Sequence, residues 1–286
     1  MGGRFRLRRL CTTLVILAGL AAWRPALAQT HDVVTESYGG RDMLVYIPSR
    51  LPLLGSRALV VVLHGGLGNA QRIASGQFES GLNMNAVAEK DGFIVAYLNG
   101  TPVTRYFGDQ MLGWNAGGGC CGLSAQNGID DVTYIQGAVA DLEARYGVEP
   151  ARVYGIGHSN GAMMTQRMMC ETRLYAAAVA ISGPLNLRAT ACPDARGKRI
   201  LAIHGADDRN VPIAGGQGTE GLSRTPYSSE DRSSQTFISS GAAYTLEVVP
   251  GADHKLDDID AVIERTDGIS IAEKAARFFG LADQKP

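Results

Sequence analysis

The stretch that decides the fold lies at residues 152–170 and reads RVYGIGHSNGAMMTQRMMC. Its first part, RVYGIG, is an apolar run typical of a strand, whereas AMMTQRMMC favours a helix because Ala, Met and Gln are good helix formers. Between them, Gly157-His158-Ser159-Asn160-Gly161 follows the pattern G-x-S-x-G. We therefore expect a tight strand-to-helix turn that carries Ser159.

A serine on such a turn is a candidate nucleophile. The sharp turn holds the serine in a strained backbone conformation, and the glycines two before and two after it let strand and helix approach closely. A serine hydroxyl is a poor nucleophile until a base removes its proton, so this interpretation requires a histidine, an acid and an oxyanion hole. A glycine-rich loop that happens to contain a serine is the alternative.

Strand-like and helix-like stretches alternate along the rest of the chain. Apolar runs typical of buried strands lie at 58–66, 92–100, 152–157, 176–182, 199–205 and 244–254, and helical patterns lie at about 80–90, 130–147 and 269–282. Two further strands flank the turn pair Gly39-Gly40. This alternation predicts an α/β fold with a mostly parallel central sheet and helices on both faces. Residues 101–128 and 214–235 are interpreted as a long loop and a polar surface excursion.

The first 28 residues have the pattern of a cleaved signal peptide. Four arginines lie among the first nine residues, a short apolar stretch follows, and Ala-Leu-Ala at 26–28 precedes Gln29. A membrane-spanning helix needs roughly 20 apolar residues, and Arg24 and Pro25 interrupt this one too early, although a retained anchor is the alternative. We therefore expect a secreted or periplasmic protein whose mature chain, 29–286, is a single domain.

Cleavage after Ala28 removes five arginines and no acidic residue. Lys and Arg then fall from 27 to 22 against 28 acids, which gives a formal charge of −6. A mildly acidic exported protein is a poor candidate for nucleic acid or for an anionic membrane surface, so we expect neither as a partner. We also expect no cofactor and no metal, because the cysteines and histidines lack zinc-ligand spacing.

Four cysteines remain after cleavage: Cys120, Cys121, Cys170 and Cys192. An even count in an exported protein favours disulfides over free thiols. Adjacent cysteines rarely bridge each other because the small ring strains the peptide between them. We therefore expect Cys120 and Cys121 to pair separately with Cys170 and Cys192, in either order.

Two histidines follow Ser159 in the chain, His204 and His254. The usual chain order for this kind of turn is serine, acid, histidine. His204 ends a strand-like run ahead of any candidate acid and is expected to be structural, whereas His254, in a loop after the last strand, is the expected base. A solvated loop histidine is the alternative for His254. The acid is expected just past the strand at 199–205, where Asp208 is favoured and Asp207 competes with it.

An oxyanion hole needs backbone N–H groups aimed at the developing negative charge. One is expected from Asn160, which follows the candidate nucleophile. The other is expected from the loop after the strand at 58–66, where Gly66 is favoured over Leu67. His158 is adjacent to the serine in sequence but is expected to point elsewhere.

Five stretches together match a known pattern: HGG at 64–66, GWNAGGGCCG at 113–122, DDVTYI at 130–135, ARVYGIGHSNGAMM at 151–164 and IHGADDRNVP at 203–212. With them the chain, from about 42 to 256, resembles a family of secreted α/β-hydrolase esterases that includes polyhydroxybutyrate depolymerases, feruloyl esterases and acetylxylan esterases. The resemblance implies a serine esterase with Ser159, Asp208 and His254 as its triad. It also implies disulfides that brace the nucleophile region.

The chain departs from that family after His254, where HKLDD stands in place of a Trp-Pro segment common among its members. Trp114 is the aromatic residue expected near the cleft as a substrate contact, with core packing as the alternative. The ester substrate stays open between polyhydroxyalkanoates and plant cell-wall acyl esters, feruloyl or acetyl-xylan. Two other functions are a non-catalytic polymer- or cell-wall-binding protein on the same fold, and a serine peptidase, which would usually carry an additional propeller or cap domain.

Overall fold

The structure is a computed structural model that describes residues 1–2, 32–106, 110–221 and 225–282. The predicted signal peptide at 1–28 lies almost entirely outside these ranges. Within them, the strands form one eight-stranded sheet and one two-stranded sheet. The strands are β1 (Asp32–Tyr38), β2 (Arg41–Ile47), β3 (Arg57–Leu63), β4 (Ile94–Leu98), β5 (Thr101–Pro102), β6 (Leu112–Gly113), β7 (Val148–His158), β8 (Ala177–Ile181), β9 (Arg199–Gly205) and β10 (Ala243–Val249).

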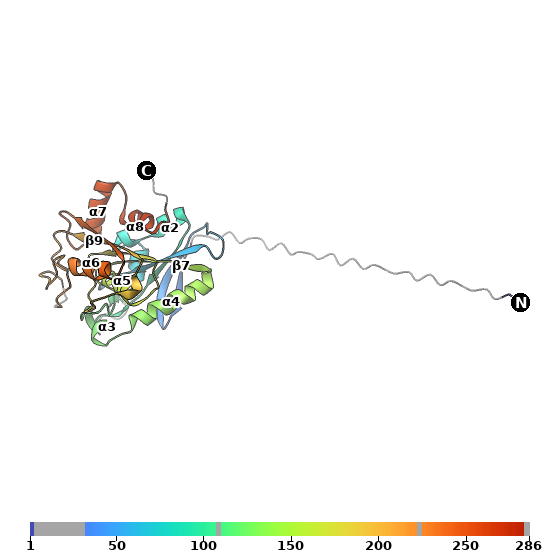
Figure 1. Ribbon diagram of the computed structural model, residues 1–286, viewed down its shortest axis with the longest axis horizontal. Helices are drawn as coiled ribbons and strands as arrows, with labels where there is room; N and C mark the ends of the chain where they lie inside the picture. Colours follow the sequence, from blue (N-terminus) through green and yellow to red (C-terminus); the bar gives the residue numbers. More distant parts are fainter. Residues whose placement is uncertain (3–31, 107–109, 222–224, 283–286) are drawn as a thin grey trace.

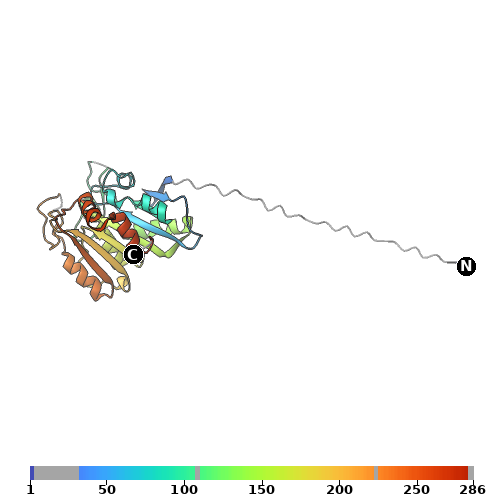
Figure 2. The same cartoon turned by 90° about the horizontal axis from the view of Figure 1, so that it is seen from above.

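The large sheet has the order β1-β2-β4-β3-β7-β8-β9-β10. Its first three strands pair antiparallel, with β1 and β2 joined by the predicted Gly39-Gly40 turn, and every later pair is parallel. Seen from above in Figure 2, the strands run from the blue N-terminal ones to the orange C-terminal ones. The mostly parallel sheet predicted from the sequence is therefore confirmed.

The central strand β3 shows why the sheet needs helices on both faces. Alternate side chains of a strand point to opposite faces. Leu59, Val61 and Leu63 pack into one core, while Val60 and Val62 pack into the other, and all five are buried. Such a continuous apolar run is stable only when both faces are covered.

Helices cover both cores. In Figure 1, α2, α7 and α8 lie on one face of the sheet and α4, α5 and α6 on the other. The helices are α1 (Ala70–Ala74), α2 (Asn85–Asp91), α3 (Gly122–Gln126), α4 (Asp131–Tyr146), α5 (Asn160–Glu171), α6 (Glu230–Ser239), α7 (Leu256–Asp267) and α8 (Ile271–Phe279), with 3₁₀ helices η1 (Ser80–Leu82) and η3 (Pro193–Ala195). Two details differ from expectation: η1 precedes a shorter helix in the segment 80–90, and α6 begins inside the expected surface excursion. In addition, α7, which the sequence did not indicate, begins two residues after His254.

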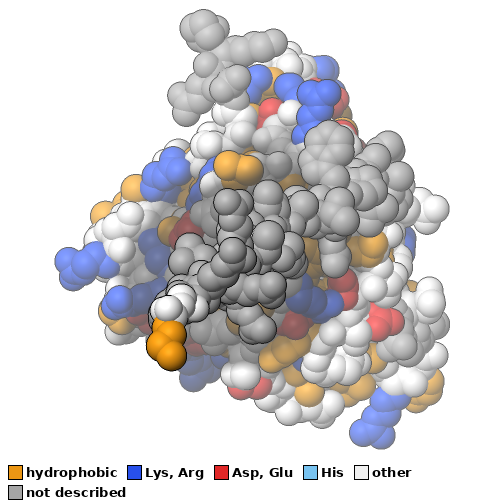
Figure 3. Space-filling view, turned by 90° about the vertical axis from the view of Figure 1, so that its right-hand side faces the viewer, with side chains coloured by type: hydrophobic (Ala, Val, Ile, Leu, Met, Phe, Trp, Pro, Cys, Tyr) orange, Lys and Arg blue, Asp and Glu red, His pale blue; other side chains and the backbone are white. Residues whose placement is uncertain are grey.

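The charged side chains do not gather on the face shown in Figure 3, where Lys and Arg are interspersed with Asp and Glu. No helix of the described residues is both long enough and apolar enough to cross a membrane.

The parallel strands bring the candidate residues to one edge of the sheet. β3, β7 and β9 run in the same direction, so the loops after their carboxyl ends lie together. These loops carry Gly66, Ser159 and Asp208 respectively, and the loop after the parallel strand β10 carries His254. This edge is where the chemistry predicted from the sequence is expected.

Candidate active site

Ser159 lies at the junction of β7 and α5, as expected. Its φ of 53° and ψ of −121° belong to a region that residues with a side chain seldom adopt. The turn is so tight that a β-carbon at Gly157 would overlap the backbone of Gly161, and one at Gly161 would overlap the carbonyl of Leu63. The two glycines of the motif are therefore required by close packing of strand, helix and the neighbouring strand.

His254 joins Ser159 to Asp208. Its Nε2 lies 2.9 Å from the Ser159 Oγ, and its Nδ1 lies 2.7 Å from the Asp208 Oδ2. Because a carboxylate only accepts hydrogen bonds, Nδ1 carries the proton and Nε2 is free to accept the hydroxyl proton of Ser159. Asp208 is buried, whereas Asp207 is exposed and donates its N–H to the carbonyl of Ala252. The structure thus brings together the three residues favoured by the sequence.

Asp208 is held as a carboxylate. Its Oδ1 accepts the backbone N–H groups of Asn210 and Val211 at 2.9 and 2.8 Å. Burial alone would raise the pKa of Asp208, but hydrogen bonds from His204 and His254 outweigh burial and hold it well below its usual range. For His254 the balance goes the other way, because burial, together with the nearby charges of His158 and His204, lowers its pKa more than the contact with Asp208 raises it. A neutral imidazole beside an ionised carboxylate is the state that a general base requires.

The expected oxyanion loop lies beside the nucleophile turn. A β-carbon at Gly66 would be 3.7 Å from the Cβ of Asn160. Within the described residues, the backbone N–H groups of Gly66 and Asn160 donate to no acceptor, whereas that of Leu67 donates to the carbonyl of Leu112 at 2.8 Å. Gly66 and Asn160 therefore have N–H groups free for a ligand, and the alternative donor Leu67 does not.

Trp114 is not placed to contact a substrate. Its side chain is completely buried, and its indole N–H donates to the carbonyl of His64 at 2.9 Å. The side-chain amide of Asn160 binds the backbone of Trp114 from both ends, accepting its N–H at 2.7 Å and donating to its carbonyl at 3.0 Å. The predicted substrate contact is therefore wrong. Trp114 packs in the core, and its indole N–H binds the His64 carbonyl, which braces the loop that carries Gly66.

A buried histidine–carboxylate pair contacts the acid, and it consists of His204, which was expected to be structural, and Glu230, which the sequence did not indicate. His204 Nε2 is 3.3 Å from the Asp208 Oδ2 and 2.9 Å from the carbonyl of Val211, and its Nδ1 is 2.9 Å from Glu230 Oε1. The phenol of Tyr244 donates to the other oxygen of Glu230 at 2.6 Å. Both ring nitrogens of His204 face acceptors alone, so the ring is an imidazolium between two carboxylates.

A second buried pair lies beside the base, and its histidine does not point away as expected. His158 Nδ1 is 2.7 Å from Glu79 Oε1, and its Nε2 is 2.8 Å from the backbone carbonyl of His254. The same carboxylate of Glu79 accepts the backbone N–H of Gly65 at 3.0 and 3.2 Å. Glu79 lies in an irregular segment with no local motif, so nothing in its sequence neighbourhood indicates this contact.

The predicted disulfide pairing is wrong. Cys120 is bonded to Cys121, and Cys170 to Cys192. Cys120 lies beside the Asn160 side chain, at the start of α5, whereas Cys170 lies ten residues further along that helix, or about 15 Å at 1.5 Å per residue. A disulfide requires Cα atoms within about 7 Å, so Cys120 and Cys170 are too far apart.

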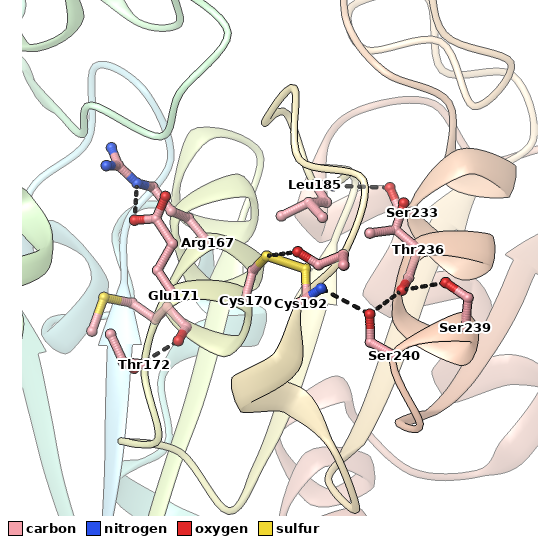
Figure 4. The surroundings of a disulfide bond; sticks show 12 residues. Arg167, Cys170, Glu171, Thr172, Leu185, Cys192, Ser233, Thr236, Ser239 and Ser240 are labelled. Atoms are coloured by element: carbon pink, nitrogen blue, oxygen red, sulfur yellow. Dashed lines mark hydrogen bonds and ion pairs between the residues drawn. A yellow bond between two sulfur atoms is a disulfide. The ribbon is translucent and has the colours of Figure 1, made fainter.

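The Cys170–Cys192 bond joins the end of α5 to the segment before η3 (Figure 4). Its Cα atoms are 4.4 Å apart, and the backbone N–H of Cys192 donates to the Ser240 hydroxyl at the end of α6 at 2.8 Å. The bond therefore braces the helix that begins at the nucleophile turn, as the family resemblance implied. No cluster of three or more His, Cys, Asp or Glu side chains suited to a metal occurs in the described part of the chain.

Comparison with known proteins gives a consistent result. A feruloyl esterase B from Piromyces equi is 29% identical over 180 residues, covering 62% of this chain and 31% of that protein. A probable acetylxylan esterase A from Aspergillus fumigatus is 32% identical over 150 residues, covering 50% of this chain and 35% of that protein. The chain thus spans about a third of the length of these two relatives.

Among solved structures, the poly(3-hydroxybutyrate) depolymerase LpqC from Bordetella parapertussis superposes with a TM-score of 0.51 at 14% identity, covering 88% of this chain and 94% of that one. At this identity the likeness shows the fold alone. The phospholipase/carboxylesterase family model matches residues 52–257. The sheet order, the helices on both faces and this match over most of the sequence confirm the predicted α/β-hydrolase fold and show that the chain belongs to the phospholipase/carboxylesterase family.

Proposed function

We propose that the protein is a serine esterase that hydrolyses carboxylic esters through Ser159, His254 and Asp208. The observation that carries the proposal is the pair of contacts made by His254, 2.9 Å to the Ser159 hydroxyl and 2.7 Å to the Asp208 carboxylate. Family membership and the feruloyl and acetylxylan esterase relatives support the same reaction class.

The reaction follows from these contacts. His254 Nε2 takes the hydroxyl proton as the Ser159 Oγ attacks the ester carbonyl carbon, and Asp208 stabilises the imidazolium that forms. The tetrahedral oxyanion accepts hydrogen bonds from the backbone N–H groups of Gly66 and Asn160. The imidazolium then protonates the departing alcohol, and water, deprotonated by the same nitrogen, hydrolyses the acyl-enzyme and releases the acid.

Covalent labelling tests the role of Ser159. A fluorophosphonate probe should label the wild-type protein at one site, and Ser159→Ala should abolish labelling while circular dichroism shows an unchanged fold. His254→Ala should slow labelling strongly, because the base is lost while the hydroxyl remains. A folded wild-type protein that takes no label would contradict the esterase proposal, and labelled Ser159→Ala protein would move the nucleophile elsewhere.

The substrate and the location of the protein are tested separately. We propose that short acyl esters are hydrolysed, with polyhydroxyalkanoates or feruloyl and acetyl-xylan esters as natural substrates. Relative rates rank these substrates when the protein is assayed on p-nitrophenyl acyl esters, methyl ferulate, acetylated xylan and hydroxybutyrate oligomers. Inactivity of folded protein on all of them contradicts the proposed ester hydrolysis. Export is proposed from residues 1–28, so the mature N-terminus should be Gln29 by mass spectrometry of expressed protein.

A further inference from the structure

A buried side chain far from the triad in sequence makes contacts that the proposed reaction does not use. Glu79 is 4% exposed, and it lies immediately before η1. Its carboxylate binds two separate parts of the site, the N–H of Gly65 in the oxyanion loop and the Nδ1 of His158 in the nucleophile turn. One carboxylate thus fixes the distance between the loop that stabilises the oxyanion and the turn that carries the nucleophile.

His158 extends this connection to the base. Its Nε2 donates to the backbone carbonyl of His254 at 2.8 Å, and the two imidazole rings lie 5.0 Å apart between centroids. The ring of His158 is bounded by the Glu79 carboxylate at one nitrogen and by the carbonyl at the other, so both nitrogens must donate. The charge of the Glu79 carboxylate compensates the resulting imidazolium in the buried site.

The segment after Glu79 holds the same region from a second point. The backbone N–H and the hydroxyl of Ser80 both contact the carboxylate of Asp257, at 3.0 and 2.8 Å. Asp257 lies in the first turn of α7, three residues after His254. Residues 79–80 are therefore linked to the segment of the base on both sides of the start of α7, Glu79 through His158 to the His254 carbonyl and Ser80 directly to Asp257.

We propose that Glu79 and His158 are positioning residues for catalysis, which hold the oxyanion loop and the His254 backbone in register with Ser159. The inference rests on the proposed esterase reaction. Neither side chain contacts the reacting atoms. They act through the Gly65 backbone and the His254 carbonyl, so their loss should misplace the base and the oxyanion donors.

His158→Phe is the direct test, because phenylalanine has a ring of similar shape and no hydrogen-bond donor. In assays with p-nitrophenyl acetate, we expect kcat to fall about 10- to 100-fold with KM within about twofold, the pattern of a lost alignment. The acid limb of the kcat/KM profile should also move to higher pH. The charged groups facing His254 are Asp208, His158 and His204, and loss of the His158 charge raises the pKa of His254.

Glu79→Gln separates geometry from charge. Glutamine can accept the Gly65 N–H through Oε1 and donate through Nε2 to a neutral His158, which still donates its Nε2–H to the His254 carbonyl. We therefore expect kcat within about threefold of wild type, with the acid limb again moved to higher pH. The matched control is Glu247→Gln on β10, which removes a carboxylate that binds Lys274 of α8. It should change neither kcat nor the acid limb.

The outcomes are distinct. A folded His158→Phe protein with wild-type kcat and an unmoved acid limb overturns the inference, as does a change confined to KM. If that variant does not fold, Glu79→Ala replaces it, because it removes the contacts with both Gly65 and His158, and wild-type kcat in folded Glu79→Ala protein overturns the inference. Wild-type protein that is folded, unlabelled by fluorophosphonate and inactive on every ester contradicts the proposed esterase function. That result is distinct from the failure of the positioning roles, which is measured on active wild-type protein.

Discussion

Glu79–His158 and Glu230–His204 are two buried carboxylate–imidazole pairs that meet the candidate triad at different points. His158 donates to the backbone carbonyl of the base, whereas His204 lies against the carboxylate of Asp208. In both pairs each ring nitrogen faces only acceptors, and in both the pKa of the histidine is raised by its carboxylate partners against the opposing effect of burial. The first pair thus determines where the base lies, and the second determines the charge around the acid.

His64 shows that burial alone does not create such an imidazolium. Its Nδ1 donates to the carbonyl of Gly65, but its Nε2 accepts the N–H of Gly100 at 3.1 Å, so the ring is neutral. Burial lowers its pKa accordingly. Three histidines in one chain therefore differ in protonation because of the groups at their second nitrogen, which is a property of the fold and not of the local sequence.

The largest expected effect comes from substituting Asp208, the residue through which the second pair contacts the triad. Asp208→Asn should lower kcat about 10⁴-fold, because an amide favours the wrong tautomer of His254 and cannot stabilise the imidazolium. Steady-state kinetics on p-nitrophenyl acetate measure the loss. Asp207→Asn is the matched control and should retain wild-type kcat, and a larger loss in this neighbour than in Asp208→Asn would reverse the assignment of the acid.

The next effect tests the second pair as a structural element. Glu230→Leu leaves the His204 imidazolium with one carboxylate in place of two, and breaking such a buried pair should lower the free energy of unfolding by about 4 kcal/mol. Urea denaturation followed by circular dichroism measures it. The control is Glu220→Leu, whose partner Arg209 is exposed and whose loss should cost less than about 1 kcal/mol. Equal losses in the two variants would show that the buried pair contributes no more than a surface one.

The sequence predicted the parts of the site that follow from chain order and local pattern. Ser159 was found by its glycine spacing, and His254 and Asp208 by their places after the last strands of an alternating pattern. These residues are brought together by the parallel sheet alone, since its strand ends share one edge. Their geometry in the structure follows that expectation.

The partners of these residues could not be predicted in the same way. Glu79 reaches His158 across 79 residues and Glu230 reaches His204 across 26, from segments with no motif of their own. The disulfide pairing failed for a related reason, because it depends on which end of α5 the 113–122 loop approaches. Trp114 was misplaced because an indole suits a cleft and a core equally well until its N–H has a partner.

The smallest expected effect is a dependence of stability on pH. Burial acts to lower the pKa of His204, but the contacts with Asp208 and Glu230 outweigh it and raise the pKa to about 9, against 6.5 for a free imidazole. A pKa that is higher in the folded state means that protonation favours folding. The contribution is therefore complete below about pH 6.5 and is lost as the pH rises through about 9, by up to about 3 kcal/mol.

Urea denaturation at pH 6, 7.5 and 9 measures this loss, and Glu230→Leu should reduce it because one of the two carboxylates that raise the pKa is gone. The imidazole carbon-bound protons, followed by NMR across the same range, then distinguish the two paired histidines from the other two. His204 and His158 should both titrate above pH 6.5, and His254 and His64 below it, because their pKa values are shifted in opposite directions. A free energy of unfolding that stays constant from pH 6.5 to 9, with His204 already neutral at pH 7, would show that the second pair is uncharged, and Asp208 and His158 would then be the charged groups that face the base.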